Sequence, residues 1–262
     1  MRLLALFGVL LAAVTLTACS GDDNAVSAVS SEPSPAYDAD TVWAALAPST
    51  PLTASTSTTP PDLNLTRSLQ QCGPPPGGST CIKTIMQGAG ATASAMDFLD
   101  TTGWILVGLR DFGPVDLGTL MSPWRANANR QYVVLNGNPE LVYAEDEGAK
   151  VKLPSDPAYQ PLVDAVTASG TTAPGAATNV ILFAADNAFE DQISVEAGGQ
   201  RIVFQYDVVN GCHACGTGYR ERVGFDFDTT GQYRTATMLG LCRGALAPLV
   251  IAGVADCPPT QQ

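Results

Sequence analysis

The stretch from residue 201 to residue 241 decides the fold: RIVFQYDVVNGCHACGTGYRERVGFDFDTTGQYRTATMLGL. Apolar and polar residues alternate in three parts of it, which predicts strands at 201–209, 219–228 and 232–241. The sequence Asp228-Thr-Thr-Gly231 is typical of a tight turn between the last two strands. We therefore expect three consecutive strands that pair in antiparallel fashion.

Further elements are predicted on the N-terminal side of this stretch. Alternating or continuous apolar residues indicate strands, the sequence Asn136-Gly-Asn-Pro139 indicates a hairpin turn, and Gly103 and Gly170 are helix stops. The predicted strands are 104–109, 115–119, 132–135, 141–143 and 180–184, and the predicted helices are 92–101 and 155–170. Because strands outnumber helices and hairpins dominate, we predict an α+β fold with a mostly antiparallel sheet and two or three helices, held by disulfides.

The N-terminus has the pattern of a secretory signal. Arg2 supplies a positive charge, and residues 3–16 form an uncharged apolar core that is too short to span a bilayer. The core ends in Leu16-Thr17-Ala18-Cys19, which resembles the lipobox of bacterial lipoproteins. That resemblance implies a signal peptide at residues 1–18 and a lipid attachment at Cys19, whose sulfur carries a diacylglyceryl group. The alternative is an ordinary signal peptide with an incidental cysteine.

The lipobox resemblance also implies a location. Two or more acyl chains on Cys19 hold a protein stably, at about 0.8 kcal/mol per buried methylene. We therefore predict that the protein associates with a membrane through lipidated Cys19. Ser20 follows the cysteine, which resembles the pattern of Gram-negative lipoproteins sent to the outer membrane. We expect a lipid-anchored protein of the cell envelope, in the outer membrane and facing the periplasm or the cell surface.

Composition divides the mature chain into two parts. Residues 19–68 are rich in Ser, Thr, Ala and Pro and are predicted to form a disordered tether, since they bury too little apolar surface to offset chain entropy. A short helix at 38–47 is expected to interrupt the tether, with Trp43 docked only loosely. Residues 69–262 are predicted to form a single globular domain.

Charge and histidine content exclude several classes of function. A formal net charge of −12 argues against nucleic acid as a partner. His213 is the only histidine, which argues against Ser-His-Asp and Cys-His hydrolases and excludes a metal site with two histidines. We expect no cofactor and no metal. Residues 145–147 are predicted to be a solvated turn, and Asp226 and Asp228 to share the polar face of a strand, with a cation site as the less favoured interpretation.

Six cysteines remain besides Cys19, and an even number in an exported chain predicts three disulfides. The preferred pairing is local in sequence: Cys72–Cys81, Cys212–Cys215 and Cys242–Cys257. The alternative joins Cys212 and Cys215 to Cys242 and Cys257. Counting from the turn at 229–230 puts Cys242 opposite about Thr217, so we expect the last four cysteines to gather at one edge of the sheet.

The tetrapeptide Cys212-His-Ala-Cys215 allows sharper interpretations. As a redox pair it resembles the motif of thioredoxin-like oxidoreductases, which place the first cysteine at a helix N-terminus, whereas a strand is predicted to follow here. As a zinc knuckle it lacks a second pair of cysteines at matching spacing. A disulfide that closes a strand connection is the favoured interpretation.

The loop at 122–130 carries residue types that anchor interfaces, namely Trp124, Arg125 and Arg130. The alternative is a covered loop in which Trp124 completes the core. Together with the block from Cys212 to Asp228, this loop resembles parts of uncharacterised bacterial envelope proteins, and that resemblance assigns no particular activity. The leading hypothesis is a non-catalytic envelope lipoprotein that binds an unknown protein or ligand, or has a structural role. The alternative is a thiol–disulfide protein that uses Cys212 and Cys215, and a carboxylate-dependent hydrolase is a third class.

Overall fold

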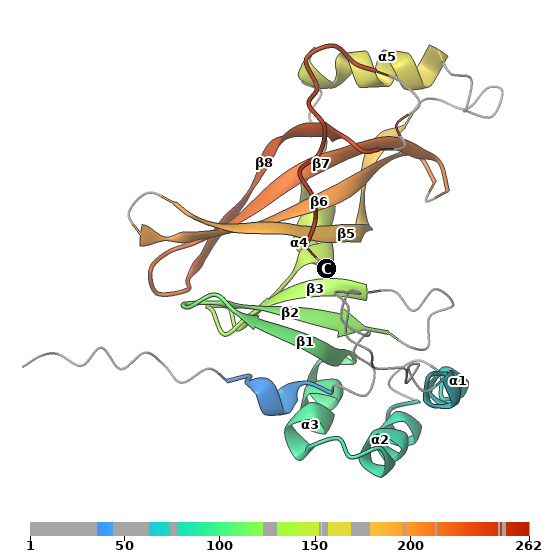
Figure 1. The fold of residues 1–262 in the computed structure, drawn as a ribbon, viewed down its shortest axis with the longest axis vertical. Coiled ribbons are helices and arrows are strands. Elements are labelled where there is room, and N and C mark those ends of the chain that lie inside the picture. The colour runs from blue at the N-terminus through green and yellow to red at the C-terminus, as the bar shows by residue number, and fades with distance from the viewer. Residues whose placement is uncertain are drawn as a thin grey trace, which may run out of the picture. The chain divides into compact units, whose positions relative to one another are not determined.

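The computed structural model describes residues 36–43, 63–73, 78–122, 130–151, 153, 157–168, 179–195, 198–212, 214–245, 247 and 250–261. These residues confirm the α+β class (Figure 1). Two four-stranded sheets have the orders β1-β2-β3-β4 and β5-β6-β7-β8, and within each sheet the strands that are consecutive in sequence pair in antiparallel fashion. The expected antiparallel sheet is therefore divided into two.

The first sheet contains the predicted hairpin. It consists of β1 (Ile105–Asp111), β2 (Asp116–Met121), β3 (Arg130–Leu135) and β4 (Leu141–Tyr143). Leu117 and Val134 are cross-strand partners and belong to the core between the two sheets, whereas Val133 and Leu135 pack on the opposite side. Alternating side chains thus give this sheet two buried faces.

Helices cover the face of the first sheet that lies away from the second sheet (Figure 1). They are η1 (Ala39–Thr41), α1 (Leu63–Gln71), α2 (Ser79–Gly88) and α3 (Ala93–Thr102). The predicted α3 is confirmed: the Thr92 hydroxyl accepts a hydrogen bond from the Ala95 amide, and Gly103, at φ 74°, ends the helix. Its apolar side chains Phe98 and Leu99 are buried.

The second sheet contains the predicted consecutive strands. It consists of β5 (Val180–Ser194), β6 (Gln200–Asn210), β7 (Gly216–Phe227) and β8 (Tyr233–Arg243). The turn between β7 and β8 is held by Asp228, whose Oδ1 accepts from the amides of Thr230 and Gln232. Phe189, Phe204 and the other inward side chains pack on the first sheet.

Residues 145–147 were predicted to form a solvated turn, and this prediction is wrong. They belong to α4 (Ala144–Lys150), which packs on the second sheet. The Tyr206 hydroxyl donates to the Ala144 carbonyl at 2.6 Å, and the Tyr233 hydroxyl donates to Glu147 Oε2 at 2.8 Å. The prediction failed because acidic residues suggested exposure, whereas two tyrosines of the opposite sheet supply partners. The predicted helix after residue 155 is found as η3 (Pro157–Tyr159) and α5 (Gln160–Ala168), and α5 packs on Val208 and Tyr219.

The folded part begins earlier than residue 69. Trp43 is only 3% exposed, shares a core cluster with Leu69, and donates its backbone amide to the Leu106 carbonyl at 2.8 Å. The prediction of a disordered tether is therefore wrong for residues 36–43 and for the start of α1, and Trp43 is not loosely docked. Of the short helix expected at 38–47, the described residues contain η1. The prediction failed because a single apolar residue in a Ser- and Pro-rich segment carries no local signal of burial. The segment is held by β1, an edge strand whose backbone groups are free to pair with it.

Several predictions fall on residues outside the described ranges. These are the signal peptide at 1–18, the lipid attachment at Cys19, His213, Trp124 and Arg125. Within the described ranges, no helix combines the length and the apolar character that a membrane crossing requires.

Candidate functional site

The three disulfides have the pairing that is local in sequence. Cys72 pairs with Cys81, Cys212 with Cys215, and Cys242 with Cys257, across sequence separations of 9, 3 and 15 residues. The preferred prediction is confirmed, and the cross-paired alternative is wrong.

The Cys212–Cys215 disulfide closes the exposed connection between β6 and β7. The Cys215 amide donates to the Cys212 carbonyl at 2.9 Å, and the next residue, Gly216, is already the first of β7. The helix N-terminus that activates the first cysteine of thioredoxin-like enzymes therefore does not follow this pair.

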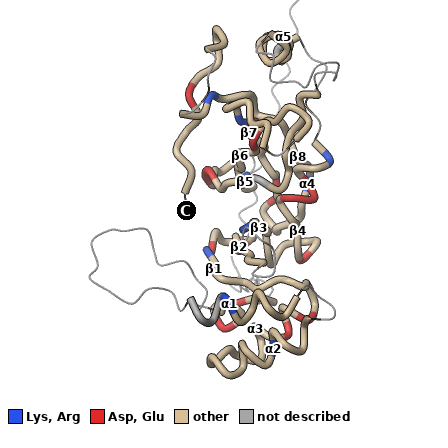
Figure 2. Tube along the Cα trace, turned by 90° about the vertical axis from the view of Figure 1, so that its right-hand side faces the viewer, with Lys and Arg blue, Asp and Glu red and all other residues tan. Residues whose placement is uncertain are grey.

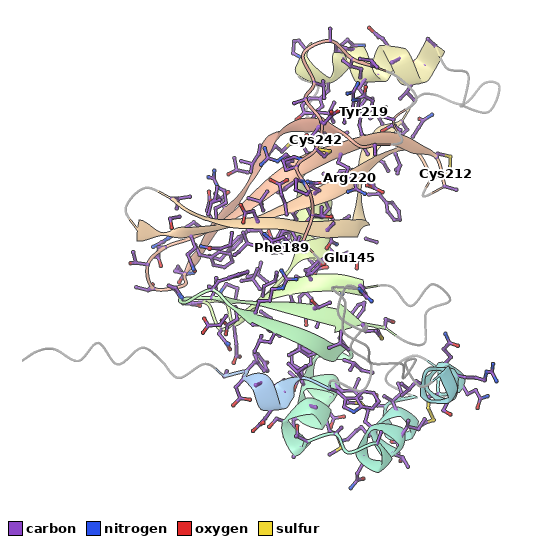
Figure 3. The ribbon with its side chains drawn as sticks, viewed as in Figure 1. Glu145, Phe189, Cys212, Tyr219, Arg220 and Cys242 are labelled. Carbon is purple, nitrogen blue, oxygen red and sulfur yellow. A yellow bond between two sulfur atoms is a disulfide. The ribbon has the colours of Figure 1, made fainter. Side chains whose placement is uncertain are left out.

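Cys242 was expected to lie opposite about Thr217, but its partner in β7 is Arg220. Two register shifts between β7 and β8 change the count from the turn, and the alternation of residues does not reveal them. Figure 3 shows Cys212 at the end of the β6–β7 hairpin and Cys242 within the sheet. The expected gathering of four cysteines at one edge is therefore wrong, and Cys242–Cys257 instead holds the C-terminal segment.

Residues 255–261, which we call the C-terminal strap, cross the face of the second sheet that lies away from the first sheet. Figure 1 shows this red segment running across the strands. The strap pairs with Arg243 of β8, accepts a hydrogen bond from the Gln205 side chain of β6 at 2.7 Å, and donates from the Gln261 amide to the Phe189 carbonyl of β5 at 2.8 Å. We call the sheet face beneath the strap the outer face.

Cross-strand ion pairs cover the outer face. Arg201 forms two hydrogen bonds to Asp226, at 2.5 and 2.8 Å, and Arg220 Nε donates to Asp207 Oδ1 at 2.8 Å. Each of these pairs joins residues directly opposite in β6 and β7. Figure 2 shows acidic and basic residues side by side on the second sheet. These bonds raise the pKa of Arg201, because the Asp226 carboxylate stabilises its charged form.

Asp226 is placed as predicted, on the strand face opposite Phe225 and Phe227, which are buried between the sheets. Its carboxylate is taken by Arg201, and the described residues contain no cluster of three acidic, cysteine or histidine side chains that could hold a metal ion. The cation interpretation of this strand face therefore has no geometric support.

A buried polar network lies at the centre of the outer face. Gln205 is 1% exposed, and its Nε2 donates to Glu190 Oε2 at 2.9 Å as well as to the strap. Its Oε1 accepts from Arg220 Nη1 at 3.3 Å, and Arg222 forms a fork of hydrogen bonds to Glu190. Gln205 thus contacts Arg220, which pairs with Asp207, and Glu190, which pairs with Arg222. The network therefore holds these side chains in one arrangement.

Two hollows adjoin this network, and both are lined by Gln205, Asp207 and Arg220. The larger hollow, of about 1080 Å³, lies between the strap and the first residues of β7. The smaller hollow, of about 270 Å³, is completed by Arg130 and by Ala185, Asn187 and Ala188 of β5.

A bulge in β5 forms the wall of the smaller hollow. Phe183 pairs with Asp207, but the next paired residue of β5 is Asn187, opposite Tyr206. The Asn187 side chain donates to the Ala184 carbonyl at 2.9 Å and so closes the bulge. Such bulges commonly occur next to functional sites, where they re-aim side chains.

Of the predicted binding residues, only Arg130 lies in the described part of the chain. It is the first residue of β3, not a loop residue, and its exposed side chain lines the smaller hollow. Sequence reasoning missed the network of Gln205, Asp207 and Arg220. The opposite charges at the outward positions of two predicted strands were the available signal.

Comparison with protein families, curated proteins and solved structures finds no match to this chain. The functional argument therefore depends on the residues and on the geometry of the outer face.

Proposed function

We propose that this chain is a lipid-anchored, non-catalytic binding protein of the bacterial cell envelope, held to its membrane through Cys19. The observation that carries the proposal is the cysteine pairing. Six of the seven cysteines form disulfides with one another, which persist in oxidising compartments outside the cytoplasm. The seventh, Cys19, is the cysteine of the lipobox-like sequence.

The distance between anchor and domain follows from where the fold begins. Tyr37 and Asn136 exchange two hydrogen bonds, from the Tyr37 amide to Asn136 Oδ1 at 2.9 Å and from Asn136 Nδ2 to the Tyr37 carbonyl at 2.8 Å. Only residues 20–36 separate Cys19 from Tyr37, and a fully extended chain of that length spans at most about 60 Å. Residues 44–62 do not lengthen this tether, because Trp43 and Leu69 share one core cluster. The domain would therefore work close to its membrane.

The outer face supports binding as the activity. Its ion pairs and Gln205 form a preorganised polar surface, and two hollows adjoin it. Preformed concave sites with a few fixed polar groups are typical of ligand binding. Ser20 after the anchor favours the outer membrane, facing the periplasm or the cell surface.

The test of the anchor is palmitate labelling of the full-length precursor in a Gram-negative host, followed by partition into Triton X-114. We expect the wild-type protein to carry label and enter the detergent phase, and Cys19→Ala to lose both properties. The variant Cys212→Ala/Cys215→Ala is the control: it loses two cysteines but retains Cys19, and it should keep the label. Export of an unlabelled wild-type protein into the aqueous phase would identify an ordinary signal peptide and contradict the anchor.

A further inference from the structure

We infer that the smaller hollow binds the terminal carboxylate of a peptide whose chain lies in the larger hollow beneath the strap. This inference names the ligand class for the proposed binding function and depends on it. It starts from Arg220, because that side chain lines both hollows.

Two side chains of β6, Asp207 and Gln205, hold Arg220 in place. Its Nε donates to Asp207 Oδ1 at 2.8 Å and its Nη1 to Gln205 Oε1 at 3.3 Å, while Gln205 is itself fixed by Glu190 and by the strap. The Arg220 side chain is nevertheless 37% exposed. A fixed guanidinium with N–H groups left for a ligand loses little entropy when it binds one. Figure 3 shows Arg220 on the second sheet beside the strap.

Arg130 supplies a second guanidinium to the smaller hollow. Its side chain is exposed, and no acidic partner for it is found among the described residues. Among the described side chains that line the hollow, Arg130 and Arg220 bring two positive charges and Asp207 brings one negative charge. This local positive excess lies in a chain of net charge −12, and it favours an anionic group. Arginine side chains bind planar carboxylates through paired hydrogen bonds.

The size of the smaller hollow limits it to the end of a ligand. Its volume of about 270 Å³ and its alanine walls, Ala185 and Ala188, suit a carboxylate with one small side chain. The rest of a ligand would continue past Asp207 and Arg220 into the larger hollow, since both hollows share these residues.

The larger hollow has the character of a site for a peptide chain. Its volume is about 1080 Å³, and five of the sixteen described residues that line it are glycine or proline, which leaves room for a ligand chain. Its charged residues besides Asp207 and Arg220 are Arg243 and Asp256, which pair with each other at 2.7 Å. A polar lining in which the charges balance suits the uncharged, hydrogen-bonding groups of a peptide main chain. Tyr219 is the aromatic residue of this lining and is 1% exposed, so it offers no platform for a sugar ring.

The test is calorimetric titration of the full mature lipoprotein in detergent with N-acetyl-trialanine as the free acid and as the C-terminal amide. We expect the acid to bind at least tenfold more tightly than the amide, because the amide lacks the charge that strengthens the hydrogen bonds from the two arginines. Arg130→Gln should reduce the affinity for the acid to that for the amide. Arg234→Gln, which changes an arginine of β8 paired with Asp228, should bind like the wild type.

A second variant tests the course of the chain. A side chain at Gly216, which lines the larger hollow, would meet nothing within 4 Å at its Cβ. Gly216→Phe should therefore place a ring in the part of the hollow next to β7, weaken trialanine binding at least tenfold, and leave acetate binding unchanged.

Equal affinities for acid and amide, or no binding of either, would overturn the inference. Binding of inorganic phosphate or acetate as tight as that of trialanine would identify a site for free anions and would overturn the peptide assignment. Palmitate labelling is independent of all these outcomes, so a failed titration of a labelled protein contradicts the ligand class and leaves the anchor standing.

Discussion

The buried side chain of Gln205 donates a hydrogen bond to the backbone carbonyl of Pro258 at 2.7 Å, and so joins the middle of β6 to the C-terminal strap 53 residues later. The same Nε2 donates to Glu190, which is 5% exposed and also bound by Arg222. One amide therefore connects the strap, a buried carboxylate and two arginine pairs. The strap is thereby tied to the outer face.

Gln205→Leu should destabilise the domain by about 2 kcal/mol, because Glu190 loses a partner in a buried position. The measurement is urea unfolding followed by circular dichroism. Gln70→Leu, at an exposed position of α1, is the control and should change stability by less than about 0.5 kcal/mol. Equal effects of the two substitutions would show that the network adds nothing to stability.

Glu221 makes stability depend on pH. Burial raises the pKa of its carboxyl above the ordinary value of 4.5, although hydrogen bonds from the Gly240 amide and the Tyr159 hydroxyl act in the opposite direction. Because the folded-state pKa of Glu221 is raised, its protonated carboxyl contributes to the free energy of unfolding. This contribution is complete below the unfolded-state pKa and is lost as pH rises through the folded-state pKa.

Glu221→Gln should therefore become more stable relative to the wild type as pH rises from 4 to 8. Tyr159→Phe should show the reverse trend, because it removes a hydrogen bond that stabilises the ionised carboxylate. Urea unfolding of the three proteins across this pH range measures both trends. Differences in stability that do not change with pH would contradict the role of Glu221.

Trp43→Ala should cost about 3–5 kcal/mol, since it leaves a cavity in the core that Trp43 shares with Leu69 and Ile105. Thermal unfolding of the full chain measures the effect. A loss below about 1 kcal/mol would instead support the loosely docked residue that the sequence suggested.

The glycines at 148 and 88 form a matched pair. A Cβ at Gly148 would lie 2.4 Å from a ring carbon of Tyr206, so Gly148→Ala should cost about 1–3 kcal/mol through overpacking. A Cβ at Gly88, in α2, would meet nothing within 4 Å, and Gly88→Ala should stabilise by about 0.4–1 kcal/mol. Chemical denaturation should give opposite signs for the two variants.

The disulfides should contribute unequally. Cys242→Ala/Cys257→Ala opens a loop with a sequence separation of 15 and should cost about 3 kcal/mol, more than Cys212→Ala/Cys215→Ala, whose loop is much shorter. Thiol trapping across a glutathione series should leave all three disulfides closed under mildly reducing conditions. Reversible opening of Cys212–Cys215 alone would favour the thiol–disulfide alternative.

The sequence by itself determined the elements whose signals are local. Alternation of apolar residues, the turn at 228–231 and the hairpin at 136–139 depend on neighbouring residues, and so does the disulfide pairing over short loops. These predictions are confirmed by β3, β4 and β6–β8 and by the three cysteine pairs.

Only the tertiary structure decided which distant residues meet. Trp43 is buried because β1 and the helices surround it, and Arg130 and Arg220 line one hollow whose wall is the bulge in β5. Register shifts and bulges set these contacts, and their energy comes from packing across the whole sheet. A sequence pattern shows which side a strand residue faces, but the residue that it meets there depends on the register of every strand between.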